Sequence, residues 1–490
     1  MSSSNGGSRP ATDTPSDTKT QIWHNNVRKT LVNEFEKDTV ADVCVFQVPT
    51  SLRPVNPEAY IPQLVSIGPY HHLRPELLEM ERFKTEAAKR VHKGFMNGPK
   101  FDVLTGKLER LDPYIRASYH KFLELNQDVL AWTMAVDGLF LFDFLCRNGI
   151  DKDFLKSSEH LKFLADSRGR KLADDAIMRD AMMLESQIPI FVLEKLLTHE
   201  CPGNWKIIKE IFPQILVGFC ERLSPIQFPC SAFSAEKALK SAHLLDLLYN
   251  IIMQKEGECR VEIPDDIFIK ENEEVEIPDD RDLYDRDVYE EIQIHSATTR
   301  MGMRTDKVLK IAGNNPLAEL IIGLMELPIS AMKSSLSAAW AEAPVTCQNL
   351  IPTATSLSRA GIKFYKTGDM KSIQFDKETA TFFLPMIELG VNSEVIIRNL
   401  IAYEAMTNMS SLMFARYIEL MDGIIDTEYD VKLLVKNGII VSNLKDGEVA
   451  KLFNEMSKSI ELPRDLEMDE TIKRVKDFYN ESARNRSVAH

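Results

Sequence analysis

The sequence predicts a mainly α-helical protein, a large helical domain with one small antiparallel β meander at about residues 361–385. Two observations support this fold class. Apolar residues recur at spacings of three and four over most of the 490 residues, which is the period of a helix with one buried face. Short, alternating, β-prone runs separated by turn residues occur together in one stretch. The chain is long enough to bury a sizeable core.

The N-terminus is expected to begin with a disordered tail, residues 1–19, which is rich in Ser, Thr, Gly and Asn. Trp23, Val27, Leu31 and Phe35 then recur at every fourth position. This spacing predicts a first helix that packs one face inward.

A proline-rich segment, residues 48–72, follows this helix. Five prolines within residues 49–70 exclude a helix, because proline lacks a backbone donor and restricts the residue before it. The segment is also too apolar and aromatic for a disordered linker. We therefore predict an ordered, extended strap that lies over the core and pins the first helix to the body.

The strap belongs to an expected N-terminal helical lobe, residues 20–255. One helix is apolar nearly all round, which predicts a central, buried position for it, and Pro189 should break or kink another, with a new helix starting there. Pro75 suits the first position of the helix that follows the strap. The predicted helices of the lobe after the strap are 76–95, 104–125, 128–147 (the central one), 174–197 and 235–253.

An acidic loop, residues 256–300, separates this lobe from the rest. Residues 256–291 contain 16 acidic and 4 basic residues, a net charge of −12 in a chain whose net charge is −14. The sequence of 261–266 recurs at 275–280, but two copies with a period of 14 do not make a solenoid. The loop is either a solvated surface insertion or an acidic interaction segment, for a basic partner or for nearby basic residues at 300–310.

The C-terminal lobe, residues 301–490, is expected to contain a helix at 318–342 and then the meander. Its three strands correspond to the runs 361–365, 372–375 and 381–384, with turn residues between them. Ser393 is a good N-cap, and helices should run from there, with breaks, to about residue 482.

Four blocks, in order over residues 40–460, make the chain resemble the plant family called domain of unknown function 247. The blocks are 48–84, which includes Gly68, Pro69, Tyr70, His71 and His72, followed by 137–145, 179–193 and 360–404. The resemblance implies a plant-specific protein for which no enzymatic activity defines the family. Some grass relatives are implicated in self-incompatibility, a recognition role, and most relatives carry a transmembrane helix close to the C-terminus.

Several classes of protein are disfavoured by composition. No window holds 18 consecutive apolar residues, so this chain is expected to lack the relatives' membrane span and to be cytoplasmic, although peripheral membrane association as in relatives stays open. Seven scattered cysteines form no C-x-x-C pair, which disfavours a zinc or redox site. The negative charge disfavours nucleic acid as a partner.

The adjacent histidines His71 and His72 could supply one metal ligand and one base. A metal site needs further ligands at a recognisable spacing, and none is found, so structural or hydrogen-bonding roles are favoured for both. We assign no catalytic, cofactor-binding or metal-binding residues, and no cofactor.

Charged and polar side chains also fall among core-facing residues. They could form a paired acid/base site, but buried charges are normally paired, so capping and ion pairs are favoured. A plausible pairing is Glu185 or Asp143 with Arg179 or Arg398. The residues concerned are Glu79, Glu81, Arg82, Asp137, Asp143, Asp180, Glu185 and Gln187.

Three functions are compatible with the sequence. The first is non-enzymatic recognition or signalling through contacts with unknown protein partners, with the acidic loop as interaction surface. The second is an enzyme with a pocket near His71 and His72. The third is a peripheral membrane scaffold. An enzymatic activity is not favoured, because no nucleotide-binding, nucleophile-elbow or zinc-protease motif is present.

Overall fold

The computed structural model describes ten stretches of the chain, together with His24 and Arg28. They are 43–54, 56–95, 100–158, 161–164, 171–226, 234–254, 351–368, 370–407, 412–456 and 466–488. All lie in one of the two compact units of the chain, which comprises residues 1–269 and 346–490. The expected tail, most of the first helix, the acidic loop and the helix at 318–342 lie outside the described residues.

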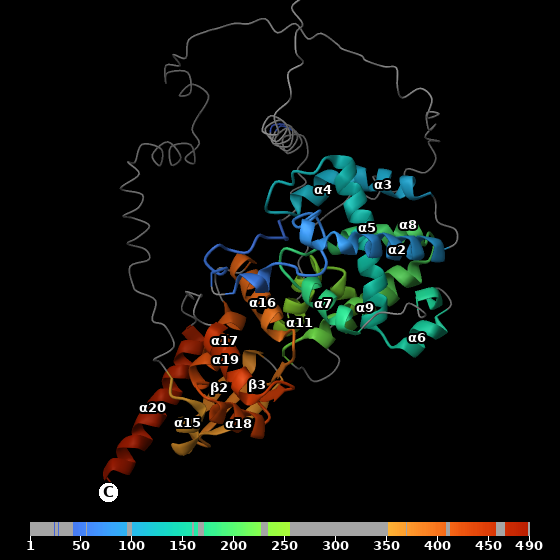
Figure 1. The fold of residues 1–490 in the computed structure, drawn as a ribbon. Coiled ribbons are helices and arrows are strands. Elements are labelled where there is room, and N and C mark those ends of the chain that lie inside the picture. The colour runs from blue at the N-terminus through green and yellow to red at the C-terminus, as the bar shows by residue number, and fades with distance from the viewer. Residues whose placement is uncertain are drawn as a thin grey trace, which may run out of the picture. The chain divides into compact units, whose positions relative to one another are not determined.

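Helices dominate the described residues and the strands are few and short, which confirms the mainly α prediction (Figure 1). The long helix α5 (Gln127–Gly149) is buried along most of its length, as predicted for 128–147. It packs against α2 (Glu79–Gly94), α3 (Phe101–Arg110), α8 (Ile190–Glu200) and α9 (Phe212–Leu223). Asn126 caps it by accepting a hydrogen bond from the Val129 N–H at 2.8 Å.

Among the described helices, α5 is long and apolar enough to cross a membrane by length and composition. However, 83% of its most apolar window is buried within the protein. In this structure, α5 is therefore a core helix that other helices surround.

Two glycines allow α5 and α9 to approach at backbone contact. A Cβ built on Gly218 would lie 2.1 Å from the Gly149 oxygen, and one built on Gly149 would lie 2.2 Å from the Ile215 oxygen. No larger residue fits at either position without moving the two helices apart.

The other helices of the first half are shorter than predicted. The 3₁₀ turn η2 (Pro75–Leu77) precedes α2, with Pro75 at its first position as expected. The run 104–125 forms α3 and α4 (Asp112–Ala117), divided because Pro113 lies in the first turn of α4. The remaining elements are α6 (Lys152–Ser157), η3 (Lys162–Leu164), α7 (Lys171–Ala181), the π-helix η4 (Ile207–Ile211), α10 (Ala235–Ala238) and α11 (Leu244–Met253).

The predicted break at Pro189 is confirmed. Helix α7 ends at Ala181, a turn occupies 182–189, and α8 begins at Ile190 with Pro189 as its N-cap residue. The turn 182–189 is buried throughout, so it places polar backbone and side chains inside the protein, where they need partners.

The three-stranded sheet has a different topology from the predicted antiparallel meander. Strands β1 (Lys363–Thr367), β2 (Gln374–Asp376) and β3 (Thr381–Pro385) are arranged in the order β1-β3-β2. Strand β1 is parallel to β3, and β2 is antiparallel to it. The central strand is therefore the most buried one, and Phe382 is paired with Phe364 on one side and Phe375 on the other. The 3₁₀ turn η7 (Met370–Ser372) buries Met370 in the connection between β1 and β2, where turn residues of a meander were expected.

A second, two-stranded parallel sheet was not predicted. Strand β4 (Ile387–Leu389) pairs with β5 (Ile440–Ser442). Each strand has three residues, too few to show a period-2 pattern in the sequence.

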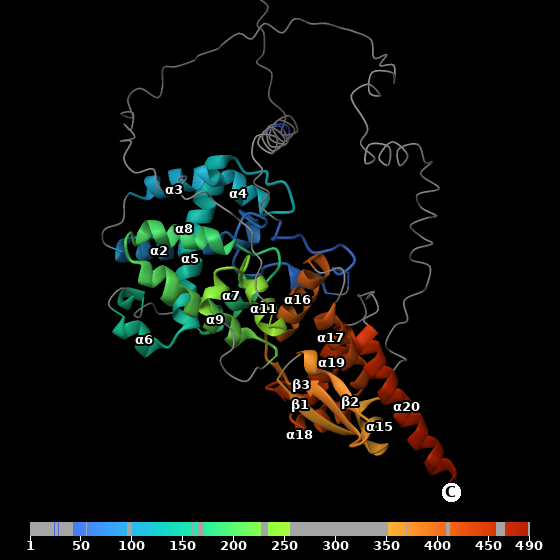
Figure 2. The ribbon, with the colours of Figure 1, turned by 180° about the vertical axis from the view of Figure 1, so that it is seen from behind.

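The C-terminal helices are α15 (Ala354–Arg359), α16 (Ser393–Thr407), α17 (Met413–Ile424), α18 (Glu428–Lys436), α19 (Asp446–Met456) and α20 (Leu466–Val488). Helix α16 begins within one residue of the predicted start, but Ser393 is its first residue and not the expected N-cap, and the Ser393 hydroxyl accepts the Gly390 N–H at 2.9 Å. It packs beside α11 (Figure 1, Figure 2). The Tyr403 hydroxyl donates to Asp246 at 2.6 Å and the Tyr249 hydroxyl donates to Glu404 at 2.8 Å, so polar as well as apolar contacts join these helices.

Candidate functional site

The polar side chains singled out from the sequence gather beneath the strap, residues 48–72. Most of the strap is irregular, with one 3₁₀ turn, η1 (Pro57–Tyr60). It buries Val48, Leu52, Val65 and Ile67 against the helices. Because an irregular backbone cannot satisfy its own N–H groups, buried parts of the strap need acceptors from elsewhere.

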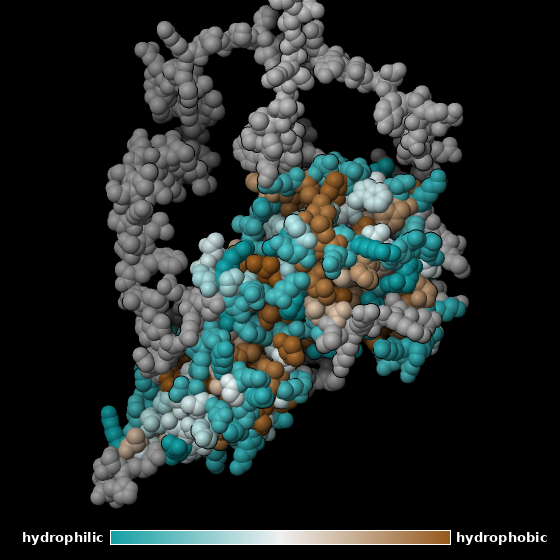
Figure 3. Space-filling model, viewed as in Figure 1, coloured by the Kyte–Doolittle hydropathy of each residue, from teal (hydrophilic) through white to brown (hydrophobic). Residues whose placement is uncertain are grey.

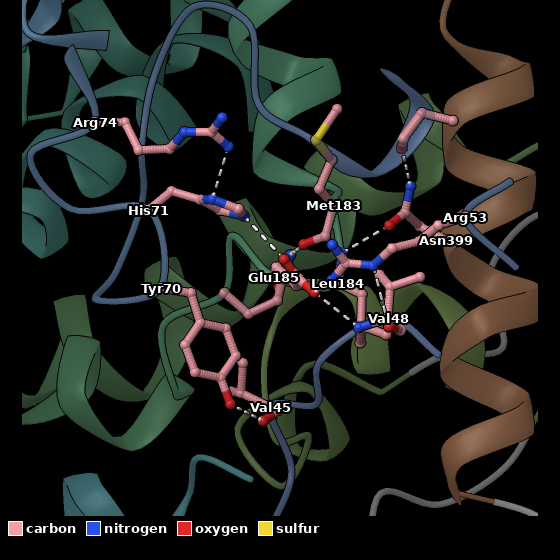
Figure 4. Close-up of polar contacts among 12 residues, drawn as sticks. Val45, Val48, Arg53, Tyr70, His71, Arg74, Met183, Leu184, Glu185 and Asn399 are labelled. Carbon is pink, nitrogen blue, oxygen red and sulfur yellow. Dashed lines mark hydrogen bonds and ion pairs between the residues drawn. The ribbon is translucent and has the colours of Figure 1, made fainter. Parts of the chain in front are cut away.

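Glu185, in the turn 182–189, is one of these acceptors. Its Oε1 accepts the Val48 N–H at 2.8 Å and a hydrogen bond from Arg53, and its Oε2 lies 3.1 Å from His71 Nε2 (Figure 4). Burial alone would raise the pKa of this carboxyl, but His71, Val48 and Arg53 outweigh burial and hold its pKa below the ordinary value. Glu185 is therefore an ionised, fully engaged carboxylate.

Asp180, the last residue but one of α7, holds the middle of the strap. Its Oδ2 accepts three consecutive backbone N–H groups, those of Gln63 at 3.1 Å, Leu64 at 2.7 Å and Val65 at 3.0 Å. Its Oδ1 accepts from Arg179 Nε and Nη2 at 3.0 and 2.9 Å. Three amides and a guanidinium compensate the burial of this charge.

Asp137 of α5 holds the end of the strap. Its Oδ2 accepts the Gly68 N–H at 3.0 Å, and its Oδ1 lies 2.6 Å from Lys84 Nζ. Lys84 is fully buried and also contacts Glu81 Oε1 at 2.6 Å and the Ser66 oxygen at 3.1 Å.

The pKa values of this pair follow from burial and charge. Burial alone would lower the pKa of Lys84, but Asp137 and Glu81 outweigh it, so the pKa is raised and the side chain is an ammonium. Burial, offset in part by Lys84, raises the pKa of Asp137 to about 6.

Gln187 and Gly68 bring the strap into backbone contact with the turn 182–189. The Gln187 side chain donates to the Ala181 and Met183 oxygens at 2.8 and 2.7 Å, and its backbone oxygen accepts from the Tyr119 hydroxyl at 2.8 Å. Gly68 has φ +76°, and a Cβ there would lie 2.9 Å from the Gln187 oxygen. This position therefore requires glycine for both conformation and space.

Asn399 of α16 links the same turn to the C-terminal half. Its Oδ1 accepts the Leu184 N–H at 2.9 Å, and its Nδ2 donates to the Ala59 oxygen at 2.8 Å (Figure 4). Asn399 thus contacts the turn and the strap at once.

The two adjacent histidines have separate environments. His71 is buried beside Glu185, whereas the half-buried His72 has its Nε2 3.5 Å from the Thr133 hydroxyl. Burial and the nearby Lys84 lower the pKa of His72. Within the described stretches, no group of three or more His, Cys, Asp or Glu side chains is placed to hold a metal ion.

The expectation that buried charges are paired is confirmed, but the suggested partners were wrong. Asp143 is bound by Arg90 at 2.8 Å and Arg147 at 3.1 Å, and Glu185 is bound by Arg53. Arg179 binds its neighbour Asp180, and Arg398 binds Glu394 at 2.9 Å, one helical turn away. Both Arg179 and Arg398 therefore pair with a carboxylate close to them in the sequence, and not with Glu185 or Asp143. Glu79 and Arg82 are exposed and take no part in the site.

Sequence reasoning missed Arg53, Lys84, Arg90, Arg147 and Asn399. For Lys84 a signal was available, because it lies four residues after Met80 and seven before Val91, on the apolar stripe of α2. For the arginines no pattern in the sequence distinguishes a buried partner from a surface residue.

The arrangement suits structural support better than acid/base chemistry. Ser66 Oγ lies 3.4 Å from Lys84 Nζ, a nucleophile–base spacing, but Ser66 is buried and the ammonium already serves three oxygens. The carboxylates of Glu185, Asp180 and Asp137 each bind backbone N–H groups of the strap segment and a cation. They form a framework, which we call the strap clamp, that replaces missing secondary structure.

Comparison with known proteins agrees with the resemblance. The model of a plant family of proteins of unknown function, DUF247, matches residues 45–490. A putative UPF0481 protein of Arabidopsis thaliana, At3g02645, is 35% identical over 486 residues, 93% of this chain and 86% of the relative. A second Arabidopsis UPF0481 protein, At3g47200, is 25% identical over 438 residues, 85% and 73% of the two chains. No solved structure matches the chain.

Proposed function

Because the chain belongs to the plant family DUF247, whose description specifies no activity, we propose a function from the geometry: non-enzymatic recognition through protein–protein contacts. One observation carries this proposal. The titratable side chains most suited to catalysis are buried at the strap clamp. Glu185, Asp180 and Asp137 each bind backbone N–H groups and a cation, and His71 contacts the side chains of Glu185 and Arg74.

The described surface offers groups that suit protein contacts. Aromatic side chains are exposed at Trp205, Tyr429, Phe83 and Trp132. Tryptophan and tyrosine dominate the binding energy of many protein interfaces. Apolar residues reach the surface in several places between hydrophilic ones (Figure 3).

The acidic segment supplies a second, electrostatic contact. With a net charge of −12 over residues 256–291, it would attract a basic partner and speed association. Contacts of this kind weaken at about 0.5 M salt, where the screening length is a few ångströms.

The test begins with affinity purification of the full-length protein from its native tissue, at low salt and at about 0.5 M salt. Recognition predicts a protein partner in stoichiometric amount, bound more weakly at high salt. A protein recovered alone, with a bound metal or small molecule, would contradict recognition and favour an enzyme.

A variant series tests the acidic segment against that partner. Replacing the acidic residues of 262–282 with serine should lower the affinity and leave the melting temperature unchanged. The matched control exchanges Asp for Glu and Glu for Asp over the same residues, which keeps the charge and should keep the affinity. Equal binding by both variants would remove the segment from the proposal.

A further inference from the structure

We propose that Leu73 is a pre-positioned contact residue that inserts into an apolar pocket of a protein partner. The inference rests on the proposed recognition function and specifies one surface that performs it. It follows from the conformation of Leu73, its exposure and the rigidity of the turn that carries it.

Leu73 has an unfavourable backbone conformation. It lies in the turn 69–74, in which the Arg74 N–H donates to the His71 oxygen at 3.3 Å, and its φ is +56°. This left-handed region suits glycine and asparagine and disfavours larger apolar residues. A leucine at this position is therefore strained.

No burial offsets this strain within the described protein. The Leu73 side chain is 57% exposed. The two other described non-glycine residues with positive φ have ordinary local explanations, since Gln254 ends helix α11 and Ala380 is a small residue in the turn between β2 and β3. Strain that the fold does not require suggests a function.

Contacts of the turn's own residues hold it in place. The Tyr70 hydroxyl donates to the Val45 oxygen at 3.0 Å and accepts from the Lys121 N–H at 3.0 Å. His71 Nε2 lies 3.1 Å from Glu185 Oε2 of the strap clamp, and Arg74 Nη1 lies 3.3 Å from His71 Nδ1 (Figure 4). A rigid turn loses little conformational entropy on binding, which favours a pre-formed contact.

The groups around Leu73 indicate a protein pocket as its partner. Arg74 pairs with Glu76 at 3.7 Å, and Glu76 and Glu79 are both exposed. An anionic membrane surface would repel these carboxylates. An exposed leucine beside an arginine and carboxylates instead fits an apolar pocket with a polar rim, as in protein interfaces.

The test separates strain from apolar contact with three variants of the full-length protein, measured against the partner purified with the wild type. Leu73→Asn suits positive φ and removes the apolar side chain, so it should keep or raise the melting temperature and weaken binding about tenfold or more. Leu73→Met keeps the strain and the apolar volume, so it should bind within about threefold of wild type. Ala380→Gly relieves similar strain elsewhere and should leave binding unchanged.

Three results overturn the inference. If Leu73→Asn binds the partner as tightly as the wild type does, Leu73 is not a contact residue, although recognition itself stands. If Leu73 is instead needed for flotation with vesicles of phosphatidylcholine and phosphatidylserine, the occupant is a membrane. A wild type that yields no stoichiometric partner contradicts recognition and this inference together, which distinguishes the two failures.

Discussion

Glu185 shows how one buried carboxylate can fix a segment that is distant in the sequence. It accepts the N–H of Val48, which lies 137 residues earlier, and it binds Arg53 and His71 on the same segment. Replacing it removes the acceptor of the buried Val48 N–H and the charge beside buried His71, whereas Arg53 is 37% exposed and also donates to the Val48 oxygen. The loss is large for the Val48 N–H and His71, because these groups stay buried when their partner is gone.

The substitution Glu185→Gln keeps the shape of the side chain and removes its charge. We expect the free energy of unfolding to fall by about 2–4 kcal/mol, as for other buried ion pairs that lose one partner. Urea denaturation measures this loss. The control is Glu86→Gln on the exposed face of α2, which should change stability by less than about 0.5 kcal/mol. Equal effects at both positions would show that Glu185 does not hold the strap.

The same carboxylate should make stability depend on pH. Its pKa in the folded protein lies below its ordinary value of 4.5, so its contribution is complete above that value and is lost as the pH falls through the folded-state pKa. The stability difference between wild type and Glu185→Gln should therefore be constant at about pH 5.5–7 and shrink at lower pH. Asp137 is present in both proteins, so its opposite contribution cancels. A difference that persists undiminished at about pH 3 would contradict the depressed pKa.

The sequence predicted which charged side chains are buried and paired, but it did not predict their partners. It indicated that Glu185, Asp180 and Asp137 are buried and paired, because charges among core-facing residues require partners. It did not identify Arg53 or Lys84, because the distance between the strap and the helices depends on the whole fold. Adjacent His71 and His72 looked alike in the sequence, yet only His71 reaches Glu185.

Among the elements, helices with strong patterns were predicted well and their ends less well. The all-round apolar pattern located α5 as the central helix, and Pro189 located the start of α8. The strand runs were recognised but their order was not, since a short turn sequence favours a hairpin and only the burial of Phe382 on both sides favours β3 in the centre.

The close contact between α5 and α9 predicts that a larger residue at Gly218 destabilises the protein. Gly218→Ala places a Cβ 2.1 Å from the Gly149 oxygen, so the helices must separate, and stability should fall by about 3 kcal/mol or more. Gly106→Ala in α3 meets nothing within 4 Å and should raise stability by up to about 1 kcal/mol through helix propensity. Thermal unfolding of both variants tests the pair. Destabilisation by Gly106→Ala of the same size would mean that packing is not the cause.

In the whole molecule, the strap and its contacts bring together the four family blocks, which lie far apart in the sequence. The block at 48–84 supplies the strap and Lys84, the block at 137–145 supplies Asp137, the block at 179–193 supplies Asp180 and Glu185, and the block at 360–404 supplies Asn399. The charged and polar residues of these blocks, which suggest an active site in the sequence, form hydrogen bonds and ion pairs that hold the strap in the fold. The partner that recognition requires has no signature in a single sequence, because surface contacts carry no fixed spacing.

Hydrogen exchange on the strap is the most direct test of this structural role. Alanine has no acceptor oxygen, so in Asp180→Ala the amides of Gln63, Leu64 and Val65 lose the carboxylate that accepts all three. We expect these amides to exchange about tenfold faster or more, while amides of α5 keep their wild-type rates. If the strap amides exchange as slowly in the variant as in the wild type, the carboxylates do not hold the strap, and their burial beside His71 would need another function.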